Sequence, residues 1–199
     1  MKSDGIAAVR KSSTTNLIPY SEDTSQSFWG DSFITWSHNQ YLSPIGTYNA
    51  TKVTSTNNAS KIVTNNTLEN SKTYTVSFYV KNISATSVKL LGYENNSASV
   101  ILNVNYVADI NTTSWVRVER TFTTTNNAEG NPVQIQPVRD LTSGQELYIW
   151  GLQVEEQTQA ETYVKTTGLP VTIDLFTENN YGTMTNMSAS DIVEDTPNN

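Results

Sequence analysis

Apolar and polar residues alternate along several short segments of this chain, which is the pattern of β-strands that bury one face. Residues 73–81 alternate most regularly, and residues 114–123 repeat the pattern. The positions predicted to face a core are Tyr74, Val76, Phe78 and Val80 in the first segment, and Val116, Val118 and Phe122 in the second. Each segment is therefore expected to form a strand with one buried face.

A different pattern occurs in residues 147–156, which are apolar at consecutive positions. Strict alternation divides the apolar residues into two faces, with Tyr148, Trp150, Leu152 and Val154 on one and Leu147 and Ile149 on the other. A strand that is apolar on both faces is usually covered on both faces. This segment is therefore predicted to be a central strand of a β-sandwich.

Further strand patterns and turn signals recur about every ten to fifteen residues, and no segment has a convincing helical period. The additional strands are expected at residues 51–54, 87–93, 99–106 and 133–138, with a hairpin loop at 94–97 and a turn at 140–145. The rest of residues 46–61 is expected to be a loop. This spacing predicts an all-β fold, a jelly-roll β-sandwich of two antiparallel sheets with extended terminal arms.

The domain organisation follows from where these strand patterns begin and end. Residues 1–15 are polar and are expected to form an N-terminal arm, which either frays or orders against a neighbouring subunit. Residues 16–171 carry the strands and are expected to form one jelly-roll domain. Residues 172–199 are polar and acidic and cannot bury a core alone, so this tail is expected to be disordered or extended along a partner.

Charge and composition narrow the function classes. The formal net charge is −7 and no Lys/Arg cluster occurs, so binding to a nucleic-acid backbone is disfavoured. The absence of cysteine excludes disulfides, thiolate metal sites and cysteine nucleophiles. No secretory signal is recognised at the start, and no stretch approaches the roughly 18 apolar residues of a membrane helix, so membrane insertion is not expected.

Catalytic constellations are not recognisable in the sequence. The single histidine, His38, lies between polar residues without a nucleophile motif. Glu155 and Glu156 are adjacent, so on a strand they point to opposite faces and do not flank one glycosidic bond. The other acids considered are surface residues in this interpretation: Asp109, Glu119, Asp140 and Glu146. The chain is expected to be no enzyme and to need no cofactor.

A structural calcium ion is left open, because jelly-roll modules can hold one with carboxylate and carbonyl oxygens. The conceivable carboxylate ligands are Glu22, Asp23, Asp31 and Glu155. No spaced Asp/Asn motif supports this set, so the sequence commits to no metal.

Aromatic side chains are the candidate ligand platform. Sugars present flat C–H faces that pack on Trp and Tyr rings, while polar side chains bond the hydroxyls. The ligand-binding candidates are Trp36, Tyr41 and Tyr48 in loop-like sequence, and Tyr79 and Trp115 on outward faces of predicted strands. Trp29 and Trp150 are expected to fill the core instead. A protein–protein contact through the same aromatic residues remains an alternative.

Several segments together carry a family resemblance. They are residues 16–22 followed by Phe28 and Trp29, residues 74–81, residues 115–118 with 122–123, and residues 147–155 followed by 162–168. In this order they resemble the jelly-roll, carbohydrate-binding-module-like domain of phage head-spike, head-fibre and tail-fibre proteins. In the tail, residues 181–187 and 190–197 resemble segments that accompany laminin-G-like domains in phage proteins.

This resemblance implies a non-enzymatic structural protein on the surface of a virion, a capsid decoration, head fibre or tail fibre subunit. It further implies contacts with other virion proteins, homo-oligomers such as trimers, and host-surface glycans as ligands. It carries over no catalytic residue. Two alternatives stay open, a free-standing carbohydrate-binding module and a polysaccharide depolymerase or a fragment of one.

Overall fold

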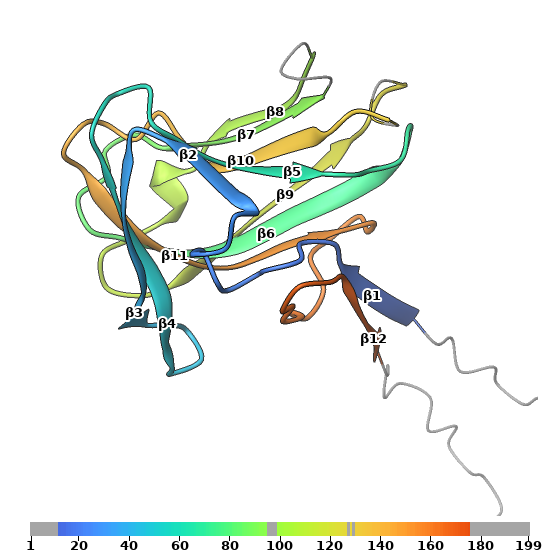
Figure 1. The fold of residues 1–199 in the computed structure, drawn as a ribbon, viewed down its shortest axis with the longest axis horizontal. Coiled ribbons are helices and arrows are strands. Elements are labelled where there is room, and N and C mark those ends of the chain that lie inside the picture. Colours follow the sequence, from blue (N-terminus) through green and yellow to red (C-terminus); the bar gives the residue numbers. More distant parts are fainter. Residues whose placement is uncertain (1–11, 95–98, 127, 129, 176–199) are drawn as a thin grey trace, which may run out of the picture. The chain divides into compact units, whose positions relative to one another are not determined.

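Two five-stranded antiparallel sheets and a two-stranded ribbon make up the fold in a computed structural model, which describes residues 12–94, 99–126, 128 and 130–175 (Figure 1). Sheet I has the strand order β2 (Trp29–Ser32), β5 (Lys61–Asn66), β10 (Val133–Arg139), β7 (Lys89–Glu94) and β8 (Ser99–Asn105). Sheet II has the order β3 (Ile34–Leu42), β4 (Tyr48–Ser55), β11 (Glu146–Glu155), β6 (Thr73–Asn82) and β9 (Val116–Thr123). The ribbon pairs β1 (Ser12–Asn16) with β12 (Val171–Leu175).

Helical structure in the described part of the chain is limited to one short 3-10 turn, η1 (Val107–Asp109). The predicted all-β jelly-roll sandwich of two antiparallel sheets is therefore confirmed. The strands predicted at residues 87–93 and 99–106 correspond to β7 and β8, which pair with each other in antiparallel register. The loop expected between them lies largely outside the described residues.

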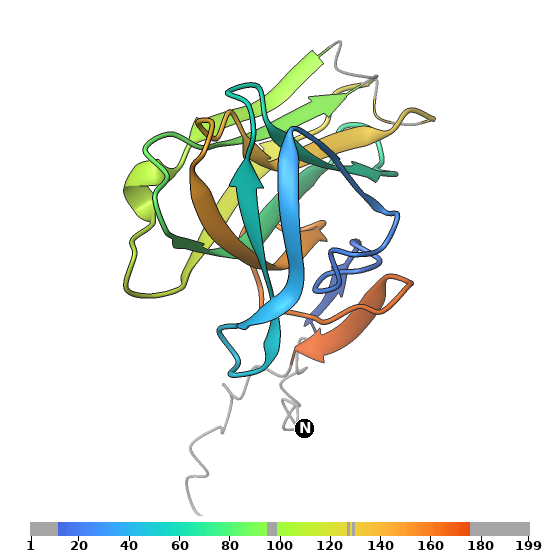
Figure 2. The ribbon, with the colours of Figure 1, turned by 60° about the vertical axis from the view of Figure 1, so that its left-hand side comes forward.

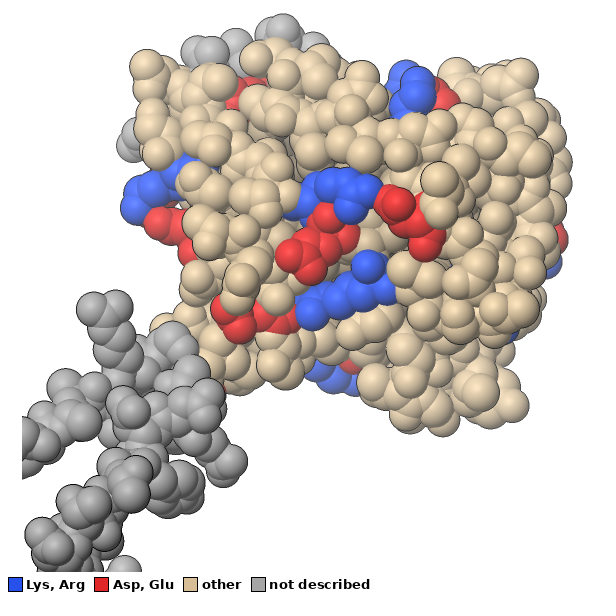
Figure 3. Space-filling view, turned by 180° about the vertical axis from the view of Figure 1, so that it is seen from behind, with Lys and Arg blue, Asp and Glu red and all other residues tan. Residues whose placement is uncertain are grey.

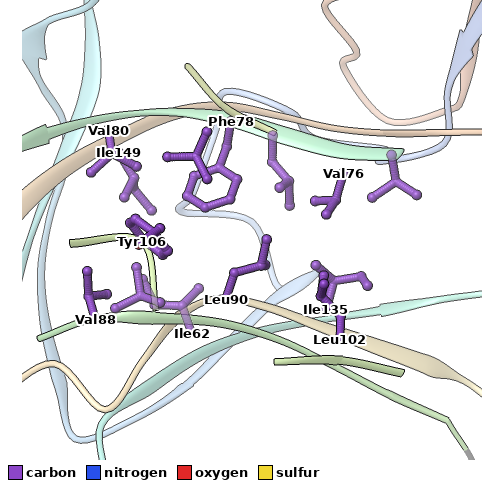
Figure 4. Close-up of a cluster of buried hydrophobic side chains, with 14 of the residues drawn as sticks. Ile62, Val76, Phe78, Val80, Val88, Leu90, Leu102, Tyr106, Ile135 and Ile149 are labelled. Atoms are coloured by element: carbon purple, nitrogen blue, oxygen red, sulfur yellow. The ribbon is translucent and has the colours of Figure 1, made fainter. Parts of the chain in front are cut away.

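A hydrophobic core fills the space between the two sheets (Figure 4). Val76, Phe78 and Val80 project from β6 of sheet II toward Leu90 of β7 and Ile135 of β10 in sheet I. Their nearly complete burial removes about 1.5–3 kcal/mol of unfavourable hydration per side chain. The alternation of residues 73–81 and 114–123 thus predicted the buried faces of β6 and β9 correctly, and Val116 packs against the same core.

β11 is the central strand of sheet II, as its apolar character on both faces predicted. Strict alternation along it is wrong beyond Trp150, because Gly151 has a positive φ of 67° and the register shifts between Trp150 and Gln153. This β-bulge inserts one residue and reverses the side to which the following residues point. Leu152 therefore lies in the core, on the same side as Ile149 rather than on the side of Trp150.

Two strands near the start of the chain form a long hairpin that the sequence pattern did not predict. β3 and β4 run side by side (Figure 2), and residues 43–47 close the turn with a hydrogen bond from Ser43 N–H to Thr47 O of 2.8 Å. The strand predicted at residues 51–54 lies within β4, and the loop expected over the rest of residues 46–61 is wrong at residues 48–50, 55 and 61. β3 was missed because most of its residues are half-buried or exposed, so it lacks the apolar alternation of β6.

The side chain of Asn16 connects β1, β11 and the segment after β11. Its Nδ2 donates to Leu152 O at 3.2 Å and to Val164 O at 2.8 Å, and its Oδ1 accepts from Ile18 N–H at 3.1 Å and from Val154 N–H at 3.3 Å. Asn16 is fully buried. One amide thus satisfies four backbone groups that would otherwise be buried without partners.

A second buried polar side chain, the carboxylate of Glu155, extends this arrangement. It accepts hydrogen bonds from the Thr14 hydroxyl, from Gln153 Nε2 at 2.9 Å and from Glu161 N–H at 3.0 Å. Gln153 in turn accepts from Val164 N–H at 2.7 Å. We refer to Thr14, Asn16, Gln153 and Glu155 as the terminal network, because they connect β1 to the segment that follows β11.

The chain divides into two units, of which the larger spans Thr14–Ile173. The predicted arm at residues 1–15 and tail at 172–199 lie mostly outside the described residues, so the predicted domain boundaries remain predictions. Among the described residues, no helix has the length and apolar character needed to cross a membrane.

Candidate ligand-binding groove

An open groove of about 370 Å³ lies at one end of the outer face of sheet II, the face turned away from sheet I. It is lined by residues of β3 and the turn after it, by residues of β6 and β11, and by the residue that precedes β9. The lining residues are Tyr41, Leu42, Ser43, Pro44, Lys81, Trp115 and Tyr148. Its volume suits a small ligand or one to two units of a longer chain.

Strand register brings these residues together. Tyr148 lies directly between Lys52 of β4 and Lys81 of β6. Trp115 comes next in the same row, because Val116 at the start of β9 pairs with Val80 of β6. Paired residues of neighbouring strands point to the same side of a sheet, so this row faces outward while Val80 and Val116 face the core.

Three aromatic rings form the wall of the groove. The ring centroids of Tyr41 and Tyr148 are 4.8 Å apart with an interplanar angle of 49°, and those of Trp115 and Tyr148 are 6.2 Å apart at 48°. All three side chains are half-buried, so each is supported on one side and exposed on the other. Such tilted rings offer a curved apolar surface on which the C–H face of a sugar ring can pack.

The polar groups at the groove are of two kinds. Lys52 and Glu146 form an ion pair of 2.9 Å, and Thr54 donates to the same carboxylate oxygen at 2.8 Å. The hydrogen bond from Lys52 lowers the pKa of Glu146, and the hydrogen bond to Glu146 raises the pKa of Lys52. Lys81, by contrast, has no ion-pair or hydrogen-bond partner among the described residues.

A second aromatic cluster lies beside the groove on the same face. Tyr79 packs edge-on against Trp150, with ring centroids 5.5 Å apart, and Trp150 lies 4.6 Å from Tyr163. The guanidinium of Arg117 lies 5.8 Å from the centre of the Tyr79 ring. Tyr163 donates to Ser21 Oγ at 2.7 Å, and burial raises the pKa of its hydroxyl.

A polar pocket of about 380 Å³ lies elsewhere in the larger unit, and its acids already have partners within the chain. Glu22 is contacted by Lys165 Nζ and Asn49 Nδ2, each at 2.7 Å. Asp23 accepts from Gln26 Nε2 and Asn39 Nδ2, also at 2.7 Å, and from the hydroxyl and N–H of Ser25. Its hydrogen bonds, those from Ser25 above all, lower the pKa of Asp23 to about 2.

The five aromatic residues singled out in the sequence occupy different places. Tyr41 and Trp115 line the groove, and Tyr79 belongs to the adjacent cluster. Tyr48 is 75% exposed in β4 and does not line the groove, although it pairs with Leu42, which does. Trp36 packs against the core.

The surroundings of Trp36 explain why it is not part of the groove. Its ring stacks on His38 at 5.0 Å, and its Nε1–H donates to Asp31 at 2.8 Å. Placing Trp36, Tyr41 and Tyr48 in loop-like sequence is corrected by the structure, since all three lie in β3 and β4.

Tyr148 and Lys81 of the groove were not among the candidates. The alternation of residues 73–81 does place Lys81 on the outward face with Tyr79, which is a signal that could have found it. Tyr148 was assigned to a face with Trp150 and Leu152, which hid its exposure because the bulge at Gly151 is not readable from apolar periodicity. Trp29 is in the core as expected, whereas Trp150 is buried on the outer face.

The four carboxylates considered for calcium each bind protein groups. Glu155 belongs to the terminal network, Asp31 accepts from Trp36, and Glu22 and Asp23 are engaged as described above. Within residues 12–94, 99–126, 128 and 130–175, no group of three or more His, Cys, Asp or Glu side chains is placed to hold a metal ion. These four carboxylates therefore do not support a structural calcium site.

A two-sheet jelly roll with an aromatic groove on one sheet defines a class of small binding modules. The carbohydrate binding domain family matches this chain over residues 28–140, more than half of its length, so the chain belongs to that family. No curated protein sequence matches the chain.

Solved structures with a similar fold have diverse functions. A CBM22-1 xylan-binding domain from Paenibacillus barcinonensis Xyn10C aligns with a TM-score of 0.52 and 10% identity, covering 71% of this chain and 91% of that chain. The Stig cyclase Fisc from Fischerella sp. TAU aligns with a TM-score of 0.56 and 11% identity, covering 75% and 100%.

A third similar structure belongs to a phage. The enzymatically active domain of Bacteriophage CBA120 tailspike protein 4 aligns with a TM-score of 0.50 and 10% identity, covering 69% of this chain but 21% of that chain. At these identities the three likenesses establish a common fold and nothing more. Function has to be argued from the family membership and from the groove.

Proposed function

We propose that this protein binds carbohydrate without chemically altering it, through the groove of Tyr41, Trp115 and Tyr148. The observation that supports this most strongly is a row of three half-exposed aromatic rings at one groove of a carbohydrate binding domain, in which Tyr148 contacts both Tyr41 and Trp115. Buried aromatic rings usually serve a core, but these three lie on the face that points away from it. Rings in this position are available to stack on a sugar ring.

The groove has polar groups for the hydroxyls of the sugar. The hydroxyls of Tyr41 and Tyr148 have no hydrogen-bond partner among the described residues, so each can donate to or accept from a ligand. Because the strands of a sheet hold the rings, little conformational entropy is lost on binding. A shallow, partly open groove fits an internal stretch of a polysaccharide or a glycan end.

A glycan array followed by calorimetry tests this proposal. The wild-type protein is expected to bind a subset of glycans, and Trp115→Ala or Tyr148→Ala should each weaken binding about tenfold, because each removes a stacking surface. Phe33→Ala is the matched control, since Phe33 is an aromatic residue with 53% exposure that does not line the groove. Absence of glycan binding, or equal loss in all three variants, would contradict the proposal.

We also propose that the chain is a structural component of a virion surface, which displays this domain on a capsid or fibre and contacts other virion proteins. This proposal is supported by two of the segments that resemble phage head-spike and fibre proteins. Residues 16–22 contribute Asn16 to the terminal network, and residues 147–155 contribute Gln153 and Glu155. Homo-oligomerisation through the chain ends, as in trimeric fibres, belongs to the same proposal. In this interpretation binding serves adsorption to host glycans.

Incorporation into particles tests the virion role. The full chain should co-purify with particles assembled from the structural proteins encoded beside its gene, and chains lacking residues 1–11 or 176–199 should be incorporated less. Normal incorporation of a chain lacking both segments would contradict assembly through the ends. A reducing-sugar assay on any polysaccharide that binds separates this proposal from a depolymerase, since release of reducing ends would exclude a purely binding role.

A further inference from the structure

Two cations on the outer face of sheet II, Lys81 and Arg117, differ from most other cations of the described residues. In the described part of the chain, most lysines and arginines are neutralised by carboxylates: Lys52, Lys72, Lys89, Arg120, Arg139 and Lys165. Cationic and acidic side chains accordingly lie next to each other on the face drawn in Figure 3. Lys61, Lys81 and Arg117 have no such partner among the described residues.

Two of these three unpaired cations, Lys81 and Arg117, lie on the outer face of sheet II, although the guanidinium of Arg117 is directed away from Lys81, toward Ser77. Arg117 of β9 pairs with Tyr79 of β6, and Lys81 follows Tyr79 by two residues on the same face, about 7 Å further along the strand. Lys81 lines the groove, and Arg117 lies two residues after Trp115. The third unpaired cation, Lys61, is in β5 of sheet I.

Arg117 also has unused hydrogen-bonding capacity. Its Nη2 donates to Ser77 Oγ at 2.9 Å, but its Nε–H is buried without an acceptor. The Nε1–H of Trp150, on the other side of Tyr79, is likewise a buried donor without an acceptor. Buried donors without acceptors are rare in folded proteins because each costs free energy, and an arginine with a free Nε–H can pair with a two-oxygen anion.

Among the described residues, no carboxylate forms an ion pair with Lys81 or Arg117. Glu146 is offset by Lys52, and Glu119, two residues beyond Arg117, accepts a hydrogen bond from Ala160 N–H at 3.0 Å. The overall charge of −7 repels anions at long range, but this repulsion is screened over about 10 Å at 0.1 M salt. Lys81 is the charged residue that lines the groove, so a ligand bound there meets this cation directly.

We propose that the groove selects an acidic glycan, one whose sugar carries a carboxylate or a sulfate group. The sugar ring packs on Trp115 and Tyr148, and its anionic group lies between Lys81 and Arg117, where the guanidinium of Arg117 turns toward it. This inference rests on the proposed carbohydrate binding and names the class of ligand. An Arg fork matches the two oxygens of a carboxylate, which favours uronic acids within this class.

Calorimetry with three oligosaccharide probes tests the inference on the full chain. Hexagalacturonate supplies carboxylates, a sulfated carrageenan hexasaccharide supplies sulfates, and xylohexaose is neutral. At least one acidic probe should bind about tenfold more tightly than xylohexaose, and raising the salt from 50 to 500 mM should remove most of this difference. The acidic probe that binds more tightly shows whether the groove prefers a carboxylate or a sulfate group.

Substitutions of single cations test whether Lys81 and Arg117 are the residues that bind the anionic group. Lys81→Gln and Arg117→Gln should each reduce affinity for the preferred acidic probe about tenfold, with little change in xylohexaose binding. Lys61→Gln is the matched control, because Lys61 is also unpaired but lies on sheet I, and it should change neither affinity.

The possible failures are distinguishable. Equal, salt-independent binding of acidic and neutral probes overturns the acidic preference and leaves carbohydrate binding intact. Equal effects of Lys81→Gln and Lys61→Gln overturn the location. Binding of no glycan in either this experiment or the array overturns the inference together with the proposed function.

Discussion

The outer face of sheet II has two contrasting ends. At one end, the terminal network of Thr14, Asn16, Gln153 and Glu155 is completely buried, and its polar groups bind each other or backbone groups. At the other end, the groove exposes aromatic rings, and its tyrosine hydroxyls and Lys81 have no polar partner within the described part of the chain. Both ends are supplied in part by β11, on opposite sides of Gly151.

The difference between the ends separates residues that stabilise the fold from residues that are available to a ligand. A polar side chain whose hydrogen bonds are all made inside the protein has nothing left to offer a ligand, but its removal leaves buried groups unsatisfied. A half-exposed side chain with free donors contributes little to stability and can bind. The two ends should therefore respond oppositely to substitution.

The largest effect on stability is expected for Asn16→Ala. The substitution leaves the carbonyls of Leu152 and Val164 and the N–H groups of Ile18 and Val154 without their partner, and should lower the free energy of unfolding by about 3 kcal/mol or more. Urea denaturation measures the change. Asn111→Ala is the control, because Asn111 is exposed and its side chain bonds only Thr113 and Ser114 of its local turn. Equal losses in the two variants would refute the special role of Asn16.

A smaller loss, about 2 kcal/mol, is expected for Gly151→Ala. Gly151 has a φ of 67°, and an added Cβ would lie 3.2 Å from the ring of Tyr163. Gly144→Ala carries the same backbone penalty at a φ of 80° but meets no atom within 4 Å, so the difference between the variants isolates the packing contribution. If both variants unfold at the same urea concentration, packing against Tyr163 is not what requires glycine at the bulge.

Asp23 tests whether the polar pocket behaves as structure or as a binding site. Its folded-state pKa of about 2 lies below the ordinary value of 3.8, so its contribution to stability is complete above pH 3.8 and is lost as the pH falls toward 2. Because Asp23 is partly exposed, solvent screening reduces this contribution to about 1 kcal/mol. Asp23→Asn should therefore lower stability at pH 7 and converge with wild type near pH 2, without changing glycan affinity. A constant difference across this range would contradict the assignment.

The smallest effect is expected for Tyr41→Phe at the groove. This substitution keeps the stacking ring and removes a hydroxyl that forms no hydrogen bond with a described residue, so stability should be unchanged while glycan affinity falls about threefold. Thermal unfolding and calorimetry on the same preparation measure both. A loss of stability with unchanged affinity would place Tyr41 with the structural residues instead.

The sequence predicted the parts of the fold that depend on regular burial. The alternation in β6 and β9 and the double-sided apolar character of β11 arise because each core-facing side chain must leave water, which leaves a period of two in the sequence. β3 was not predicted because most of its residues are half-buried or exposed, so they leave no apolar alternation in the sequence. The bulge at Gly151 was not predicted because glycine adopts both positive and negative φ angles, so its presence in a strand does not indicate a bulge.

The groove was predicted only in part for a related reason. Tyr41 and Trp115 were recognised as aromatic residues without a clear core role, but Tyr148 was hidden in an apolar run. Lys81 could not be recognised from the sequence, because its lack of an ion-pair partner among the described residues depends on pairing between strands that are distant in sequence. Register and pairing, rather than local pattern, create the site.

The most direct test of the groove uses the indole N–H resonances of the four tryptophans in a titration of ¹⁵N-labelled protein with hexagalacturonate and xylohexaose. Trp115 should shift on binding, whereas Trp29 and Trp36, whose N–H groups donate to Tyr20 O and Asp31, should stay unchanged. A saturating shift confined to Trp115 and its neighbours is the result predicted here. A shift of Trp36 with Trp115 unchanged would contradict the assignment of the groove as the binding site.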